Sequence, residues 1–182
     1  HNILSVDQLR ADTAVTPLLG DLSDLYADMD HGYSAAAGQY GFRCDGCADN
    51  CCMTRFYHHT FLEYIYLRKG FSELAASDRQ AVLERAREYV EALAAFDAGN
   101  REGVFRMMCP LNDADMCMVY AYRPMICRLH GIPHELAPPG RPKMVFAEGC
   151  AVFAADCGDQ PYYRFDRTDY YSRLSALEAR LR

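Results

Sequence analysis

A dense group of cysteines constrains this chain more than any other feature of its sequence. Four of the nine cysteines fall within residues 44–52, in the run CDGCADNCC, and the other five are spread over the second half. Thiolates at two- and three-residue spacings can surround one soft metal ion or cluster, because a short loop then carries several sulfurs. The spacing therefore favours a metalloprotein.

Disulfides and unrelated buried thiols are the alternatives to metal binding. Small secreted domains need disulfides because their cores are small, whereas 182 residues that are 51% hydrophobic can bury a sizeable core unaided. The adjacent Cys51 and Cys52 cannot pair with each other without severe strain. The sequence shows no signal peptide or glycosylation sequon, although it opens on His1 rather than Met, which a tag remnant or a trimmed leader would explain. These observations favour metal binding and predict a cytoplasmic location.

Charge and hydropathy limit the partners that we expect. The formal net charge is −6, and the only lysines are Lys69 and Lys143, so the chain has no polybasic patch. No stretch approaches the roughly 20 apolar residues of a membrane span. We therefore expect neither nucleic acid nor a membrane as partner. A protein or redox partner is left open.

Helical patterns alternate with cysteine-rich loops along the chain. They predict a mainly α single domain over residues 1–182, in which several helices clamp cysteine-rich metal-binding loops, with one short β-hairpin. Its expected parts are an N-terminal helical segment (1–42), a cysteine-rich metal-binding core (43–157) and a C-terminal helix (158–182). The hairpin is expected to pair residues 129–132 with residues 144–146 across a Pro-Pro-Gly turn at 138–140.

Capping signals locate two of the helices. Thr60 and Glu63 read as a capping box that starts a helix through about residue 68, which Gly70 is expected to stop. A similar signal at Ser77 predicts a longer helix through residue 96, ended by Gly99. Its expected apolar stripe is Val82, Ala86, Tyr89, Val90, Leu93 and Phe96.

Two further helices follow from apolar periodicity alone. Residues 17–40 carry apolar side chains at helical spacing, and the acidic residues of this segment are interpreted as a solvated face. The C-terminal helix is predicted from about Thr168, because leucines recur there at three and four residues.

Eight of the cysteines are predicted as metal ligands. Consecutive side chains diverge, so Cys51 and Cys52 cannot easily hold the same ion: either two centres share this loop, or one of the pair does not touch the metal. Eight sulfurs make two four-thiolate sites, two clusters, or one of each. Cys157 is left out, as a small buried hydrophobe. The predicted ligands are Cys44, Cys47, Cys51, Cys52, Cys109, Cys117, Cys127 and Cys150.

The cysteine patterns resemble those of a bacterial family. The first group, the later Cys109-Pro-Leu and the run CMVYAYRPMICR at residues 117–128 are similar to the zinc- or iron-chelating family named for its CxxCxxCC motif. Three residues separate Cys47 from Cys51, where the family pattern has two. The resemblance spans roughly residues 43 to 150, and it implies binding of zinc, iron or an iron–sulfur cluster.

Two classes of function are compatible with such a centre. Four thiolates around each metal close the site and make the metal structural, as in a binding module. An iron centre with an open position would instead suit an oxidoreductase or a transferase. A flagellin lysine methylase is related to the family, which makes a methylase-like role one implication of the resemblance. However, the sequence has no glycine-rich nucleotide loop after a strand, so it shows no site for S-adenosylmethionine.

Histidines and arginines near the cysteines are secondary candidates. The histidines could add nitrogen ligands or hydrogen bonds to sulfur, and ordinary packing is the alternative. A fixed positive charge beside a cysteine would lower its pKa, whereas the alternative is a surface ion pair. The stronger histidine candidates are His58, His59 and His130, and the weaker ones are His134 and His31. The arginines are Arg43, Arg55, Arg123 and Arg128.

Overall fold

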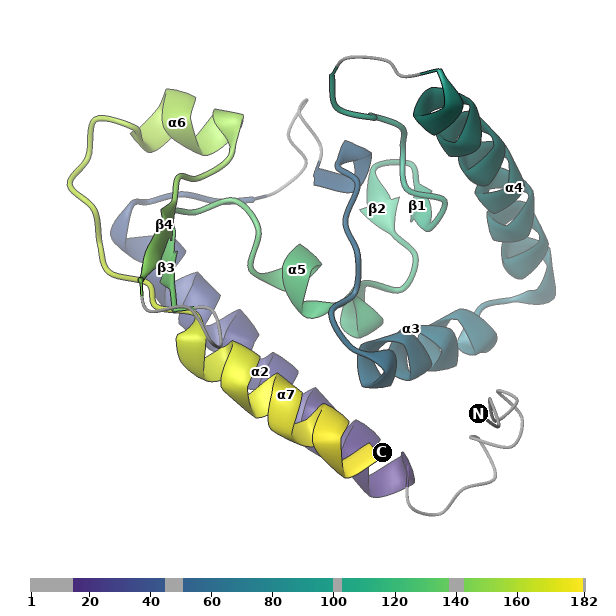
Figure 1. Cartoon of the computed structure of the whole chain (residues 1–182), viewed down its shortest axis with the longest axis horizontal. Coiled ribbons are helices and arrows are strands. Elements are labelled where there is room, and N and C mark those ends of the chain that lie inside the picture. The colour runs from purple at the N-terminus through teal and green to yellow at the C-terminus, as the bar shows by residue number, and fades with distance from the viewer. Residues whose placement is uncertain (1–14, 45–50, 100–102, 138–142, 182) are drawn as a thin grey trace.

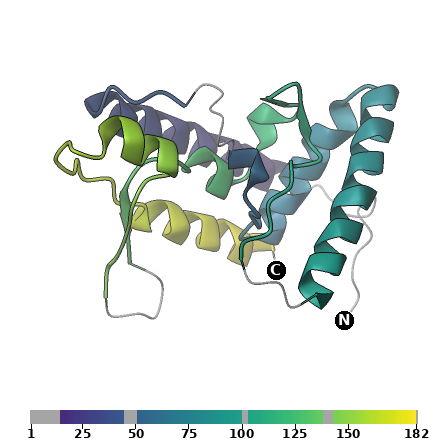
Figure 2. The ribbon, with the colours of Figure 1, turned by 90° about the horizontal axis from the view of Figure 1, so that it is seen from above.

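The computed structural model describes residues 15–44, 51–99, 103–137 and 143–181, without the side chain of Cys51. Within these residues the chain is mainly helical, and its strands form two small antiparallel pairs (Figure 1). The predicted fold class is therefore confirmed. Seen from above, helix α4 (Ala76–Ala98) stands at one end of the molecule, and the short turn at Cys51–Met53 lies between it and the paired helices α2 (Val15–Gln39) and α7 (Thr168–Leu181) (Figure 2).

Helices α2 (Val15–Gln39) and α7 (Thr168–Leu181) lie side by side, and both contribute apolar side chains to the main core. Leu22, Met29 and Leu174 are almost completely buried there, because apolar residues recur every three or four positions on each helix. The acidic face predicted as solvated is partly used for pairing. Asp21 and Asp28 of α2 form ion pairs of 2.7 and 2.6 Å with α7 arginines, which ties the two helices together.

Helix α3 (Phe61–Glu73) begins at the predicted capping box but does not end at Gly70. The N–H of Glu63 donates to Oγ1 of Thr60 at 3.2 Å, and the N–H of Thr60 donates to Oε2 of Glu63 at 3.1 Å. Gly70 lies inside the helix against the 3-10 turn η2 (Tyr120–Tyr122), where any Cβ would overlap the ring of Tyr122. This glycine therefore permits close packing and does not stop the helix.

Helix α4 (Ala76–Ala98) corrects the second capping prediction. The helix starts one residue before Ser77, and its N-cap residue Ala75 makes no side-chain capping bond. Gly99 is the C-cap, as expected.

The predicted apolar stripe of α4 is only partly buried. Val82 is buried, whereas Val90 is 62% exposed. The reason is that α4 stands at the edge of the molecule (Figure 1), and part of the stripe faces the loop that carries Phe105. In that loop the ring of Phe105 lies 5.3 Å from Tyr89 and 5.5 Å from Phe96.

Strands β3 (His134–Leu136) and β4 (Val145–Ala147) form the expected hairpin with a changed first strand. The second strand is displaced by one residue from the prediction, and residues 138–140 lie outside the described residues. The predicted first strand, 129–132, is not a strand. Leu129 and Ile132 are instead each 1% exposed in the main core, so their apolar character reflects burial.

A second, unpredicted strand pair joins β1 (Asn112–Asp113) to β2 (Met116–Cys117). Its turn places Ala114 and Asp115 at φ of 46° and 65°. These values occur in hairpin turns that usually contain Gly or Asn, so the Ala-Asp pair did not indicate a turn here. A search of the described helices for one long and apolar enough to cross a membrane finds none.

Candidate metal centre

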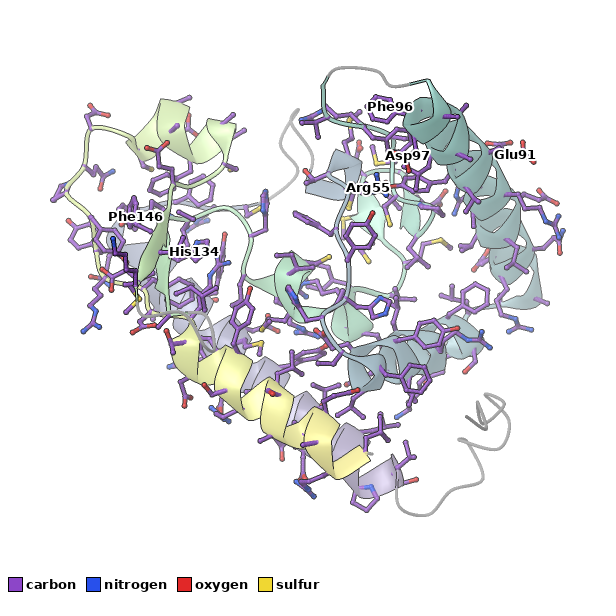
Figure 3. All side chains as sticks on the ribbon, viewed as in Figure 1. Arg55, Glu91, Phe96, Asp97, His134 and Phe146 are labelled. Carbon is purple, nitrogen blue, oxygen red and sulfur yellow. The ribbon has the colours of Figure 1, made fainter. Side chains whose placement is uncertain are left out.

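Four cysteines from separate segments gather beside β1 and β2. Cys52 lies in the 3-10 turn η1 (Cys51–Met53), Cys117 ends β2, and Cys127 lies in α5 (Met125–Arg128). Cys109 joins them through its backbone N–H, which donates to the carbonyl oxygen of Cys52 at 2.8 Å. Figure 3 shows sulfur atoms gathered in this region, beside the labelled Arg55. The fold therefore brings together thiols that are up to 75 residues apart in the sequence.

The thiols of this group are close enough to affect one another's ionisation. Burial raises the pKa of Cys109 to about 11 and that of Cys127 to about 12, and it also raises the pKa of Cys117. In each case the charge on neighbouring thiolates, including that of Cys52, raises the pKa further. The three thiols are therefore neutral at pH 7 unless a cation stabilises their thiolate forms.

Helix α5, which carries Cys127, is anchored by a buried carboxylate. Glu63 is 0% exposed, and its Oε1 accepts hydrogen bonds from the N–H of Met125 at 2.8 Å and the hydroxyl of Tyr26 at 3.1 Å. Met125 is the first residue of α5, so this carboxylate connects α2, α3 and α5 at one point. The capping signal located Glu63, but it did not indicate this long-range role.

Two of the candidate arginines hold the segment around Cys127. Arg128 is buried and forms an ion pair with Asp30. Its Nε donates to the carbonyl oxygen of Arg123 at 2.8 Å, and its Cζ lies 4.1 Å from the ring centroid of Tyr26. Arg123 pairs with the same Asp30 at 3.0 Å. Burial still raises the pKa of Cys117 and Cys127, but the charge of Arg123 offsets a small part of that rise, which is the direction expected for an arginine beside a cysteine.

Other arginines differ from the expectation. Arg55 forms an ion pair of 3.3 Å with Asp97 of α4, and Figure 3 shows the two side chains close together. Arg43 is exposed. Arg85 of α4, which the sequence did not suggest, donates from Nε to the carbonyl oxygen of Pro110 at 2.9 Å, and its charge offsets a small part of the rise that burial causes in the pKa of Cys109. No local signal could have found it, because its partner lies 25 residues away.

The candidate histidines make aromatic contacts. The exposed rings of His58 and His59 lie 5.7 Å from Tyr64 and 5.2 Å from Tyr171. The half-buried ring of His130 lies 5.0 Å from Phe56. These contacts agree with the alternative in which the histidines have an ordinary packing role and are not metal ligands. Of the weaker candidates, His134 lies in β3 and His31 is exposed on α2.

The remaining cysteines lie elsewhere in the fold. Cys150 caps α6 (Ala151–Cys157), where its Sγ accepts from the N–H of Phe153 at 3.4 Å. Cys157 is only 5% exposed and belongs to the main hydrophobic core. Cys44 is exposed at the edge of a described range. Cys47 and the side chain of Cys51 lie outside the described residues, so their predicted ligand roles stay predictions.

The four gathered cysteines are ligands of the kind that a soft metal ion binds, although their side chains do not converge on one point. In the described ranges, no three His, Cys, Asp or Glu side chains form a group that could hold an ion as they stand. The thiols of Cys52, Cys109, Cys117 and Cys127 are nevertheless near neighbours of the type that zinc and iron prefer. Metal–sulfur bonds of about 2.3 Å would require these thiols to move inward.

Comparison with known proteins identifies one family. The family model CxxCxxCC, described as "Putative zinc- or iron-chelating domain", matches residues 43–151, which is more than half of the chain. The matched region contains all eight cysteines predicted as ligands and excludes Cys157. No curated protein and no solved structure matches the chain.

Proposed function

Because the chain belongs to the CxxCxxCC family of zinc- or iron-chelating domains, we propose that its described cysteines form a four-thiolate metal centre. One observation carries this proposal: thiols from η1, the loop before β1, β2 and α5 gather in one place. The proposed ligands are Cys52, Cys109, Cys117 and Cys127, and the ion is zinc or iron.

Four thiolates would close the coordination sphere and give the metal a structural role. The bound cation would stabilise the thiolate forms, which burial alone disfavours. Structural zinc sites provide roughly 10–16 kcal/mol of apparent binding free energy, against about 5–15 kcal/mol for the net stability of a domain. The ion would therefore hold η1, the β1–β2 pair and α5 together, and α4 indirectly, because α4 contacts this region through Arg85.

A second centre is proposed from the remaining predicted ligands, Cys44, Cys47, Cys51 and Cys150. Two points support it: the family match covers all of them, and Cys150 lies at α6, apart from the four-thiol group (Figure 1). Separate centres would also remove the difficulty of binding one ion with the adjacent Cys51 and Cys52. Because thiolate ligands persist in reducing compartments, a cytoplasmic location is part of this proposal.

Metal analysis of protein purified without oxygen, combined with a visible spectrum, tests the proposal. We expect stoichiometric zinc or iron, with Cys47→Ser losing the second centre and keeping the first. A colourless zinc protein would rule out the alternative of an iron–sulfur oxidoreductase or methylase-like transferase. Protein that folds fully without any bound metal would contradict the proposed function.

A further inference from the structure

Asn112, the first residue of β1, has a buried amide nitrogen that donates no hydrogen bond. The residue is 7% exposed, and its Nδ2 atom is buried without a hydrogen-bond partner among the described residues. An amide NH₂ group carries two donors, and buried donors of this kind are almost always paired in folded proteins, because they have lost their hydrogen bonds to water. This donor is therefore available to an acceptor within the fold.

The strand register places the side chain of Asn112 beside a proposed metal ligand. Asn112 lies directly opposite Cys117 in the β1–β2 pair. The N–H of Met118 donates to the carbonyl oxygen of Leu111 at 2.9 Å, so Asn112 and Cys117 form the non-hydrogen-bonded pair next to this bond. In such a pair the two side chains share one face of the strands, with Cβ atoms about 4.5–5.5 Å apart.

A second proposed ligand also borders this residue. The backbone N–H of Asn112 donates to the carbonyl oxygen of Cys109 at 2.9 Å, which closes the turn between Cys109 and β1. Asn112 is thus the one residue of β1 that contacts the Cys109 turn through its backbone and faces Cys117 with its side chain. Its buried amide nitrogen belongs to the region where the thiols gather.

The thiols of this group already use N–H donors from the backbone. A hydrogen bond from the N–H of Leu111 offsets part of the rise that burial causes in the pKa of Cys109, and the N–H of Val119 has the same effect on the pKa of Cys117. Four thiolates around a divalent cation would leave an excess of negative charge on the sulfurs. Further N–H donors stabilise such buried charge.

We propose that Asn112 is a positioning residue of the metal centre, whose Nδ2 donates a hydrogen bond to the metal-bound thiolate of Cys117. This inference rests on the proposed four-thiolate centre. A neutral thiol is a weak acceptor, whereas a thiolate is a strong one, so the bond forms when the sulfur is charged. It stabilises the charge on this sulfur and holds the ligand in place, as partners of metal ligands do in other metal sites.

The test uses the full-length protein loaded with Co²⁺, which substitutes for zinc or iron at thiolate sites and absorbs visible light. Competition with a chelator gives the affinity. The d–d bands report the tetrahedral geometry, and the sulfur-to-cobalt charge-transfer band reports the charge on the sulfurs. Asn112→Leu keeps the approximate volume of the side chain but removes the donor. We expect its Co²⁺ affinity to fall about 10–100-fold. Its charge-transfer band should move to lower energy while its d–d bands stay those of a four-thiolate site.

Asp113→Leu is the matched control, because it also replaces a short polar side chain of β1 by leucine. The side chain of Asp113 lies on the opposite face of the strand and is 65% exposed. This variant should bind Co²⁺ with the affinity and the spectrum of the wild type.

Asn112→Asp is the second variant, in case Asn112→Leu fails to fold. It keeps the shape of the side chain and replaces the NH₂ group by a carboxylate oxygen, which repels the thiolates. Its loss of affinity should be at least as large as that of Asn112→Leu.

The wild-type spectrum separates the two hypotheses. A wild type without thiolate-to-cobalt charge transfer would overturn the metal centre and this inference together. A wild type with a four-thiolate spectrum, but with an Asn112 variant that keeps its affinity and its charge-transfer band, would overturn only the hydrogen bond. A loss of affinity without any shift of the band would also count against this bond, because a change in packing alone would then explain it.

Discussion

The side-chain carboxylate of Glu63 accepts a hydrogen bond from the backbone N–H of Met125 across 2.8 Å. This bond connects the start of α3 to the start of α5, and α5 carries one of the four gathered cysteines. The same carboxylate accepts from the N–H groups of His59 and Thr60, at 2.8 and 3.1 Å, and from the hydroxyl of Tyr26. A buried charge with this many donors fixes the relative position of the elements that supply them.

Replacing this carboxylate should weaken both the fold and the metal centre. Glu63→Gln turns one acceptor oxygen into an N–H₂ group that faces other donors, so we expect a loss of about 2 kcal/mol or more in the free energy of unfolding. Metal affinity should fall as well, because Cys127 is no longer held in place. Urea denaturation and competition with a chelator measure the two effects.

The control is Glu73→Gln, at an exposed residue at the end of α3 whose Oε2 accepts from the hydroxyl of Tyr122 at 2.5 Å. It should change both quantities little. If the two variants behave alike, Glu63 does not have the anchoring role described for it.

Gly70 should tolerate no side chain. Gly70→Ala places a methyl group against the ring of Tyr122, and overpacking of this kind costs about 1–3 kcal/mol. Gly38→Ala is the matched control in helix α2, because a Cβ there meets nothing within 4 Å. It should raise stability by about 0.5–1 kcal/mol, since alanine favours a helix over glycine. Thermal unfolding of the two variants should therefore shift in opposite directions, and a Gly70→Ala variant as stable as the wild type would refute the close packing.

These glycines show which features could be predicted from sequence. The capping box of Thr60 and Glu63 was visible because its partners are three residues apart. The same local reasoning was wrong for Gly70, since the ring that requires the glycine comes from Tyr122, 52 residues later. It was also wrong for residues 129–132, where apolar character reflects burial in the core. Sequence signals whose partners lie within one turn of a helix can be interpreted correctly. Where a residue's role depends on a tertiary contact, the same kind of local signal can be misinterpreted.

The candidate metal centre was likewise predictable only where the signal was local in the sequence. Cysteine spacing predicted metal binding, and the resemblance of the cysteine motifs indicated the family; the family match confirms both at the level of a zinc- or iron-chelating domain. Spacing did not show that Cys52 lies with Cys109, Cys117 and Cys127, because that grouping depends on where η1, β2 and α5 meet. Arg85 was missed for the same reason: it acts on Cys109 from a helix with no cysteine of its own.

Acid should destabilise the protein through His134. Burial and the charge of Arg167 lower the pKa of His134 to about 4, from an ordinary value near 6.5. Between these two pH values the unfolded chain binds a proton that the folded protein does not, so stability falls as the pH falls from 6.5 to 4. The half-buried ring is partly screened by solvent, so we expect a loss of about 1 kcal/mol.

His134→Gln should remove this part of the pH dependence. The difference between wild type and variant, measured by urea denaturation at pH 7 and pH 4.5, isolates the contribution of His134. His31→Gln, at an exposed position on α2, is the control and should follow the wild type. A wild type and a His134→Gln variant with parallel pH profiles would count against the depressed pKa.

Metal binding should release protons. At pH 7 the raised pKa values keep Cys109, Cys117 and Cys127 protonated in the metal-free protein, and an ion can bind only their thiolates. We expect about three or more protons released per ion, and metal affinity that rises steeply with pH between 6 and 8. Calorimetry in buffers of different ionisation enthalpy gives the proton count. A release of one proton or none would mean that these buried thiols do not bind the ion.

The most direct test of the four-thiolate centre compares the metal content of Cys127→Ser with that of Cys157→Ser. Both residues are cysteines in short helices, but only Cys127 lies among the gathered thiols, while Cys157 is buried in the apolar core. We predict that Cys127→Ser loses about one equivalent of zinc or iron relative to the wild type, and that Cys157→Ser retains the full content. Equal metal content in the two variants would contradict the proposed centre.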